Sequence, residues 1–137
     1  MEACVMAGTV TQTANRQGSV IDVVLTCTAD ASDGSFPATA ITEKISGYLI
    51  HMITNPGSTA PQSNYDITLP EDKGSIDVLQ GTGANRHASN SELAVVVYNS
   101  TSLHPVVSQD DTLTFTLANN NVNSAVVVAT LRFVALY

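Results

Sequence analysis

Residues 113–117 read Leu113-Thr114-Phe115-Thr116-Leu117, and this strict alternation of apolar and polar side chains decides the fold class. Successive side chains of a β-strand point to opposite faces, so the two leucines and the phenylalanine share one face and the threonines share the other. A strand with this pattern buries its apolar face and leaves its polar face in water. The stretch therefore predicts a half-buried β-strand.

The same period of two recurs along the chain. Residues 20–28 and 65–69 alternate in this way, and residues 93–98 and 126–137 are β-branched runs that are apolar on both faces. No segment shows the 3.6-residue apolar period of an amphipathic helix. The ranges that we predict as strands, with one pair expected to merge, are 7–14, 19–29, 36–43, 45–54, 65–69, 75–79, 93–99, 111–118 and 125–136.

Turn signals separate these runs and indicate the architecture. The Asn119-Asn120-Asn121 run between the last two predicted strands is typical of a hairpin loop. Short strands alternating regularly with turns favour an all-β fold, an antiparallel β-sandwich of the jelly-roll or immunoglobulin-like type with about seven to nine strands. We expect an N-terminal arm over residues 1–18 and a single β-sandwich domain over residues 19–137.

Length and composition favour a single domain that makes contacts with other proteins. The 137 residues suffice for one core, and charged residues are only 12% of the chain, about half of the roughly 25% found in typical soluble domains. A neutral surface costs little to desolvate. A strand that is apolar on both faces must be covered on both, so we expect the last strand to supply a subunit contact or, alternatively, to be covered by loops of its own chain.

The net charge excludes two classes of partner. The formal charge is −7, and the five basic residues are scattered along the chain. Binding to a phosphate backbone requires a basic footprint, so we expect no nucleic-acid partner. We expect no membrane contact either, because attraction to anionic lipids also needs basic residues and no apolar run reaches the roughly 20 residues of a spanning helix.

The candidate metal and phosphate sites are weak. His51, His87 and His104 stand at spacings that place no two of them on one strand or helix face, so they do not predict a metal site. Residues 30–35 have some acidic character but lack the ligand spacing and the distal Glu of a calcium loop.

Residues 81–86 begin like a phosphate loop but lack its third Gly and its Lys-Ser/Thr pair. We predict a tight loop there, in which Arg86 pairs with Asp77 or Glu92.

The sequence also lacks the signatures of covalent catalysis. There is no Gly-x-Ser-x-Gly elbow. We expect Cys4 and Cys27 to be inert thiols, with a disulfide between them as the alternative. The sequence therefore predicts that the protein is not an enzyme and has no metal or other cofactor.

Several turn-and-strand patterns resemble those of small structural proteins encoded in tailed-bacteriophage genomes. The resemblance covers roughly residues 6–134. Its segments are Met6 to Thr13, Gly47-Tyr48-Leu49-Ile50, Thr54-Asn55-Pro56-Gly57-Ser58-Thr59-Ala60-Pro61, Asn64-Tyr65-Asp66-Ile67-Thr68-Leu69 and Asp77 to Arg86. The resemblance implies a virion component, most specifically a capsid decoration (cement) protein that binds the outer capsid shell and stabilises it.

The resemblance also implies partners, and the sequence itself indicates where the chain contacts them. The partners would be the major capsid protein and further copies of this chain, with a trimer favoured, on the outer capsid surface. The alternatives are a head–tail connector or tail structural subunit and, from another class, a host-surface or glycan-binding β-module. We expect contacts in residues 1–19, in the loops 54–64 and 80–91, and on the last strand. The predicted interaction residues are Val10, Gln12, Arg16, Pro56, Gly57, Asn85, Arg86, Arg132 and Leu136.

Overall fold

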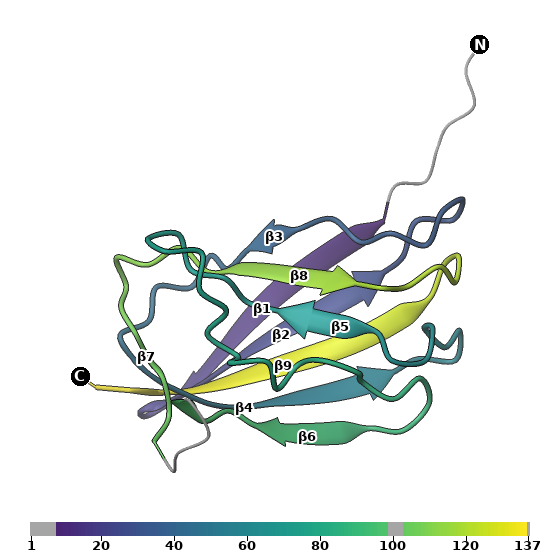
Figure 1. Cartoon of the computed structure of the whole chain (residues 1–137). Helices are drawn as coiled ribbons and strands as arrows, with labels where there is room; N and C mark the ends of the chain where they lie inside the picture. Colours follow the sequence, from purple (N-terminus) through teal and green to yellow (C-terminus); the bar gives the residue numbers. More distant parts are fainter. Residues whose placement is uncertain (1–7, 99–102, 137) are drawn as a thin grey trace.

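The computed structural model describes residues 8–98 and 103–136, which form two antiparallel β-sheets (Figure 1). The large sheet has the strand order β1-β2-β9-β4-β6, with β7 also pairing with β4, and the small sheet has the order β3-β8-β5. The strands are β1 (Thr9–Gln17), β2 (Val20–Thr28), β3 (Thr39–Ala40), β4 (Gly47–Pro56), β5 (Asp66–Thr68), β6 (Glu92–Val95), β7 (Val106–Val107), β8 (Thr114–Ala118) and β9 (Val126–Ala135).

The core contains side chains from both sheets. Burial alternates residue by residue along β2 and β9, and Leu25 and Phe133 are fully buried on these two strands. The small sheet contributes Ile67 and Phe115 to the same apolar cluster. The predicted all-β, antiparallel fold is therefore confirmed, and the two sheets sharing one core are consistent with a β-sandwich. The jelly-roll or immunoglobulin-like type stays a prediction.

β1 and β2 form a hairpin. Gly18, with φ 60°, and Ser19 connect them, and Gly at the first central position is typical of a type II′ turn. The register runs without interruption from Gln17 opposite Val20 to Thr9 opposite Thr28. The arm expected over residues 1–18 is therefore corrected, because residues 9–17 are a strand of the large sheet. Residues 1–7 lie outside the described residues.

Two predicted strands are shorter than expected or absent. Within residues 75–79, Asp77 forms a single β-bridge with Pro70, and no strand is present. The physical reason is the Asp77 carboxylate, which accepts hydrogen bonds from the amides of Leu79 at 3.0 Å and Gly81 at 3.1 Å and so bends the chain. Within residues 36–43 only β3 is a strand, whereas β7 lies where no strand was predicted.

The Asn-rich run after β8 is not the predicted hairpin loop. β8 belongs to the small sheet and β9 to the large sheet, so residues 119–125 cross from one sheet to the other. Asn119 and Ser124 adopt left-handed backbone conformations, with φ 61° and 58°. The side-chain Nδ2 of Asn120 donates to the carbonyl oxygens of Gly34 at 2.7 Å and Val122 at 3.1 Å. These bonds fix the crossing.

Candidate functional site

One face of the large sheet points away from the small sheet and the core, and we call it the outer face. Its side chains are half-buried or exposed and alternate with the core residues along each strand. The cross-strand register assigns to it Thr9, Thr11, Thr13, Asn15 and Gln17 on β1, Val20, Asp22, Val24, Thr26 and Thr28 on β2, Val126, Val128, Thr130, Arg132 and Val134 on β9, Tyr48, His51, Ile53 and Asn55 on β4, Leu93 and Val95 on β6, and Val106 on β7.

The outer face is polar at one edge and apolar at the other. Its β1 positions are Thr, Asn and Gln, whereas large apolar residues are exposed at the opposite edge: Tyr48 by 37%, Leu93 by 55%, Val95 by 52% and Val106 by 60%. Leu93 lies opposite Ile53, and Val106 lies opposite Tyr48, so the apolar side chains are neighbours. None of these residues was predicted as a contact, although the run over residues 93–98, apolar on both faces, was a signal for Leu93 and Val95.

Among the described residues of the outer face, the formally charged side chains are Asp22 and Arg132, and they form an ion pair. Arg132 on β9 lies directly opposite Asp22 on β2. Its Nε and Nη2 each donate to one carboxylate oxygen of Asp22 at 2.8 Å, which is a bidentate pair. The hydrogen bond from Arg132 holds the pKa of Asp22 below its ordinary value, although partial burial opposes this shift. The pair is therefore charged at neutral pH and electrically neutral as a unit.

His51 lies beside this ion pair because of a β-bulge. The register between β4 and β9 shifts between Leu49 and His51, which places Ile50 as an extra residue and His51 opposite Arg132. The Nε2 atom of His51 is buried and has no hydrogen-bond partner among the described residues. Burial, followed by the charge of Arg132, lowers the pKa of His51, so the imidazole is neutral at pH 7.

The predicted interaction residues on β1 make contacts within the chain. Val10 packs against the core. Gln12 donates through Nε2 to the Ala40 carbonyl at 2.7 Å and accepts from the Thr42 amide at 2.9 Å. Arg16 forms an ion pair with Glu43 at 3.2 Å. These side chains connect the edge strand to residues 40–43.

The other predicted interaction residues are dispersed. Pro56 lies opposite Val127 at the end of β4, and the Gly57 amide donates to the Val126 carbonyl at 2.7 Å. The Asn85 amide donates to the Asp66 carboxylate at 2.8 Å. Leu136 is 58% exposed just after β9, and Arg132 is the one predicted residue on the outer face.

Arg86 forms an ion pair with Glu92, one of the two partners predicted for it. Its Nη1 lies 3.6 Å from a carboxylate oxygen of Glu92, while its Nε and Nη2 each donate to the Ala84 carbonyl at 3.2 Å. Asp77, the other alternative, instead accepts from backbone amides, including that of Leu69 at 2.8 Å. Arg86 therefore stabilises the 81–86 loop internally.

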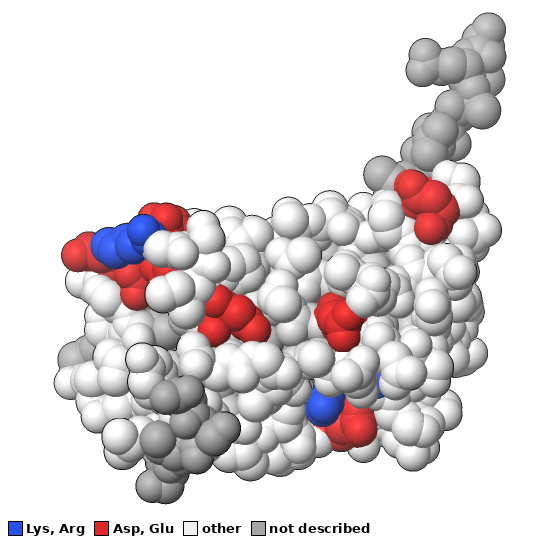
Figure 2. All heavy atoms as spheres, viewed as in Figure 1, with Lys and Arg blue, Asp and Glu red and all other residues white. Residues whose placement is uncertain are grey.

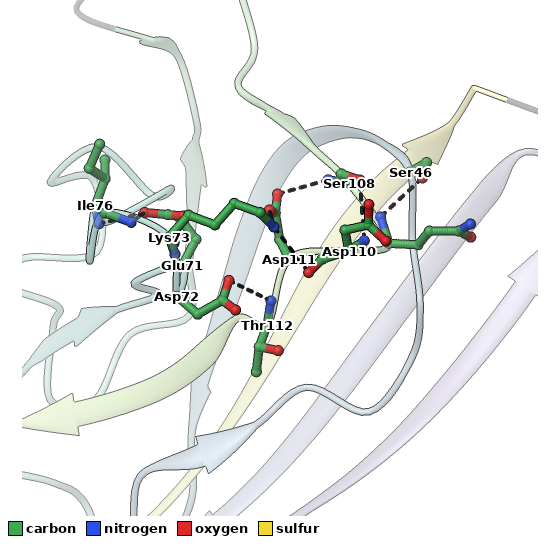
Figure 3. A network of polar contacts seen from close by, with 11 residues as sticks. Ser46, Glu71, Asp72, Lys73, Ile76, Ser108, Asp110, Asp111 and Thr112 are labelled. Carbon is green, nitrogen blue, oxygen red and sulfur yellow. Dashed lines mark hydrogen bonds and ion pairs between the residues drawn. The ribbon is translucent and has the colours of Figure 1, made fainter.

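Away from the outer face, carboxylate oxygens of Glu71, Asp72 and Asp111 lie within 4.8 Å of one another (Figure 3). Glu71 accepts from the amides of Gly74 at 2.7 Å and Ile76 at 3.0 Å, and the Ile76 bond is the largest cause that lowers the pKa of Glu71. The Asp72 carboxylate accepts from the Thr112 amide at 3.0 Å. Lys73 Nζ donates to Asp111 at 2.7 Å. The cluster connects the 71–76 turn to residues 108–112.

Among residues 8–98 and 103–136, neither the histidines nor Cys27 belong to a group of side chains that could hold a metal ion. The His87 ring accepts from the Ser89 and Asn90 amides at 3.0 and 2.9 Å, whereas Nδ1 of His104 is 2.6 Å from the Val96 carbonyl oxygen. Cys27 is a free thiol in the core, and burial raises its pKa to about 12. Cys4 lies outside the described residues.

Charged side chains are sparse on the face that carries the small sheet. Figure 2 shows them as separate small groups between wide neutral areas. The outward side chains of β8 are Thr114 and Thr116, which makes that face more polar than the valine-rich centre of the outer face. The two faces of the molecule therefore differ in hydrophobicity, although both carry few charges.

Comparison with family models, with curated proteins and with solved structures found no match. Over residues 8–98 and 103–136, no helix is long and apolar enough to span a membrane.

Proposed function

We propose that this chain is a non-catalytic structural protein of a bacteriophage virion, most specifically a decoration protein that binds the outer surface of the capsid shell and stabilises it. The observation that carries this proposal is the outer face, which combines exposed Tyr48, Leu93, Val95 and Val106 with a single internally neutralised ion pair. The resemblance to phage structural proteins supplies the virion context.

The chemistry of the outer face suits contact with protein. Burying apolar side chains lowers the free energy by roughly 25 cal/mol for each Å² that is removed from water. Because Asp22 already accepts two bonds from Arg132, a partner that covers this pair does not bury an unpaired charge. The neutral Thr and Asn side chains of β1 provide the polar rim that is typical of protein interfaces.

The size of the outer face also suits a stable interface. The strands β1, β2, β9, β4, β6 and β7 have 9, 9, 10, 10, 4 and 2 residues. With a rise of about 3.3 Å per residue and a strand spacing of about 4.8 Å, they cover roughly 700 Å². Interfaces of standard size bury about 800 Å² on each partner. The area of the outer face is therefore close to what a standard interface buries on one partner.

A binding experiment with shells tests this proposal. Capsids are purified from a phage whose genome encodes the chain and from which its gene has been deleted, and purified protein is added back. We expect wild-type protein to bind in hundreds of copies and to raise the melting temperature of the shell, because a ligand that binds only the assembled state stabilises it. Quantitative mass spectrometry counts the copies, and a number near a dozen would indicate a connector or tail subunit instead.

Two variants locate the binding surface. Val95→Lys places a charge on the outer face, and Ile76→Lys places the same charge on a residue of similar exposure, 58% against 52%, away from that face. We expect Val95→Lys to lose shell binding and Ile76→Lys to keep it, with both melting like the wild type in solution. Normal shell binding by Val95→Lys, or no binding by the wild type, would contradict the proposal.

A further inference from the structure

The large sheet has one long edge, and that edge is β1. β1 has nine residues and a single strand neighbour, β2, among the described residues. On the opposite edge, β6 and β7 have four and two residues and are separated by residues 96–105. The small sheet ends in β3 and β5, with two and three residues.

Natural proteins shorten or interrupt edge strands because an unpaired row of backbone groups is a template for another strand. β1 contains no proline and no lysine, and its ladder with β2 shows no bulge. Every other sheet edge described here is short or interrupted, so the length of β1 sets it apart.

The hairpin geometry shows which backbone groups face the open edge. Gln17 and Val20 flank a two-residue turn, so they form a hydrogen-bonded pair, and such pairs alternate along an antiparallel ladder. The odd-numbered residues of β1 therefore bond to β2. The amide and carbonyl groups of Gln12 and Ala14 point outward, away from β2.

We propose that β1 pairs with β1 of a second copy of this chain, antiparallel and about a two-fold axis at Thr13. This register places Gln12 opposite Ala14 of the second copy, so that the outward backbone groups of both strands meet as hydrogen-bonded pairs. Thr13 then lies opposite its own symmetry mate in a non-hydrogen-bonded pair, where side chains approach most closely.

The sequence of β1 suits pairing with itself. Its one charged residue, Arg16, would lie opposite Val10 of the second copy, so no like charges face each other. The outer-face residues of β1 are polar and uncharged, and Thr–Thr pairs across strands are favourable. The two outer faces would join into one continuous surface of twice the area. The resulting dimer differs from the trimer that the resemblance implies, and it does not depend on whether the outer face binds a capsid.

A charge-swap experiment tests the pairing on the full chain by sedimentation velocity over a range of concentrations. We expect the wild type to reach twice the 14.3 kDa chain mass. Thr13→Lys and Thr13→Glu each place two like charges opposite each other at the axis, and we expect each to raise the dissociation constant of the dimer by roughly fivefold or more. An equal mixture of the two variants should form a dimer more tightly than either variant alone.

Thr26→Lys is the matched control, because Thr26 is exposed on the outer face but lies on β2, away from the edge. We expect it to form a dimer as the wild type does, and thermal unfolding should show that all variants are folded. Hydrogen exchange provides a second readout, in which the Gln12 and Ala14 amides exchange more slowly in the dimer.

Several outcomes would overturn the proposal. They are a monomeric wild type at every concentration, an unchanged dimer of Thr13→Lys, a mixture that gains nothing, and Thr26→Lys weakening the dimer as much as Thr13→Lys does. Protection of the β1 amides only when shells are present would assign the edge to a strand of another protein. Loss of shell binding in Val95→Lys is measured separately, so this proposal and the capsid proposal fail independently.

Discussion

At the scale of single residues, the outer face is organised by a cross-strand charge pair in an apolar setting. Asp22 and Arg132 are far apart in the sequence but directly opposite in the sheet, and their bidentate contact satisfies both Asp22 oxygens. This hydrogen bond from Arg132 is the largest cause of the lowered pKa of Asp22, larger than the effect of the nearby charges. Because the folded-state pKa lies below the ordinary value of 3.8, the contact makes stability depend on pH.

We predict that Asp22→Asn lowers the melting temperature by a few degrees at pH 7 and that this difference shrinks as the pH falls below about 4. A group with a lowered folded-state pKa contributes its full stabilisation above the unfolded pKa and loses it as the pH drops through the folded one. Thermal unfolding followed by circular dichroism between pH 2.5 and pH 7 measures the difference. Asp110→Asn, which removes an equal charge from an exposed turn, controls for net charge. A difference that is the same at all pH values would contradict this prediction.

At the scale of elements, β4 and β9 approach each other closely at Gly47. A Cβ atom at this position would overlap the carbonyl oxygen of Val134 and lie 2.8 Å from the Cα atom of Ala135. Both atoms belong to the backbone of the central strand, so neither can turn aside as a side chain could. The bulge at Ile50 lies a few residues further along β4, so the strand is irregular at this end.

We predict that Gly47→Ala lowers the free energy of unfolding by about 1–3 kcal/mol or more, because the backbone of β4 or β9 must move to make room for the added Cβ atom. Chemical denaturation followed by circular dichroism measures the loss. Gly74→Ala is the control, since its Cβ would meet only side-chain atoms, the nearest being Glu71 Oε1 at 3.3 Å. We expect that control to change stability by no more than about 0.5 kcal/mol. Equal effects of the two substitutions would show that the close approach is unimportant.

Sequence patterns located most elements but not their partners. The alternation in residues 113–117 and 20–28 identified β8 and β2, because burial on one face leaves a visible period of two. The prediction over residues 75–79 was wrong because the Asp77 carboxylate competes with strand pairing, an effect that apolar periodicity does not report. The outer face was only partly predictable: Arg132 was named, but its partner Asp22 required the register of β2 against β9.

At the scale of the whole molecule, β9 joins the two ends of the chain. It pairs with β2 on one side, with Val20 opposite Val134, and with β4 on the other, so it lies at the centre of the large sheet (Figure 1). β2 lies near one end of the sequence and β9 near the other, so the residues that pair between them are far apart along the chain. Closing such a loop is costly before any contact forms, so the sheet is expected to assemble cooperatively.

We predict that a chain lacking residues 126–137 does not fold, since β2 and β4 then lose their shared neighbour and the core loses Leu131 and Phe133. Urea denaturation and amide NMR dispersion measure this as the loss of a cooperative transition and of dispersed signals. A chain lacking residues 1–7 is the control, because it retains every ladder described here, and it should unfold cooperatively. A cooperative transition in the first truncation would contradict the central role of β9.

Side-chain alternation was enough to predict the all-β, antiparallel class and the half-buried character of most strands, because it records which face of a strand meets the core. The three-dimensional arrangement was needed to show that residues 9–17 pair with β2 as an edge strand, that β8 and β9 lie in different sheets, and that Asp22 faces Arg132. Strand pairing uses backbone hydrogen bonds that are the same for every residue. A single sequence therefore reveals where strands are but not which strands become neighbours, and both the outer face and the β1 edge depend on that order.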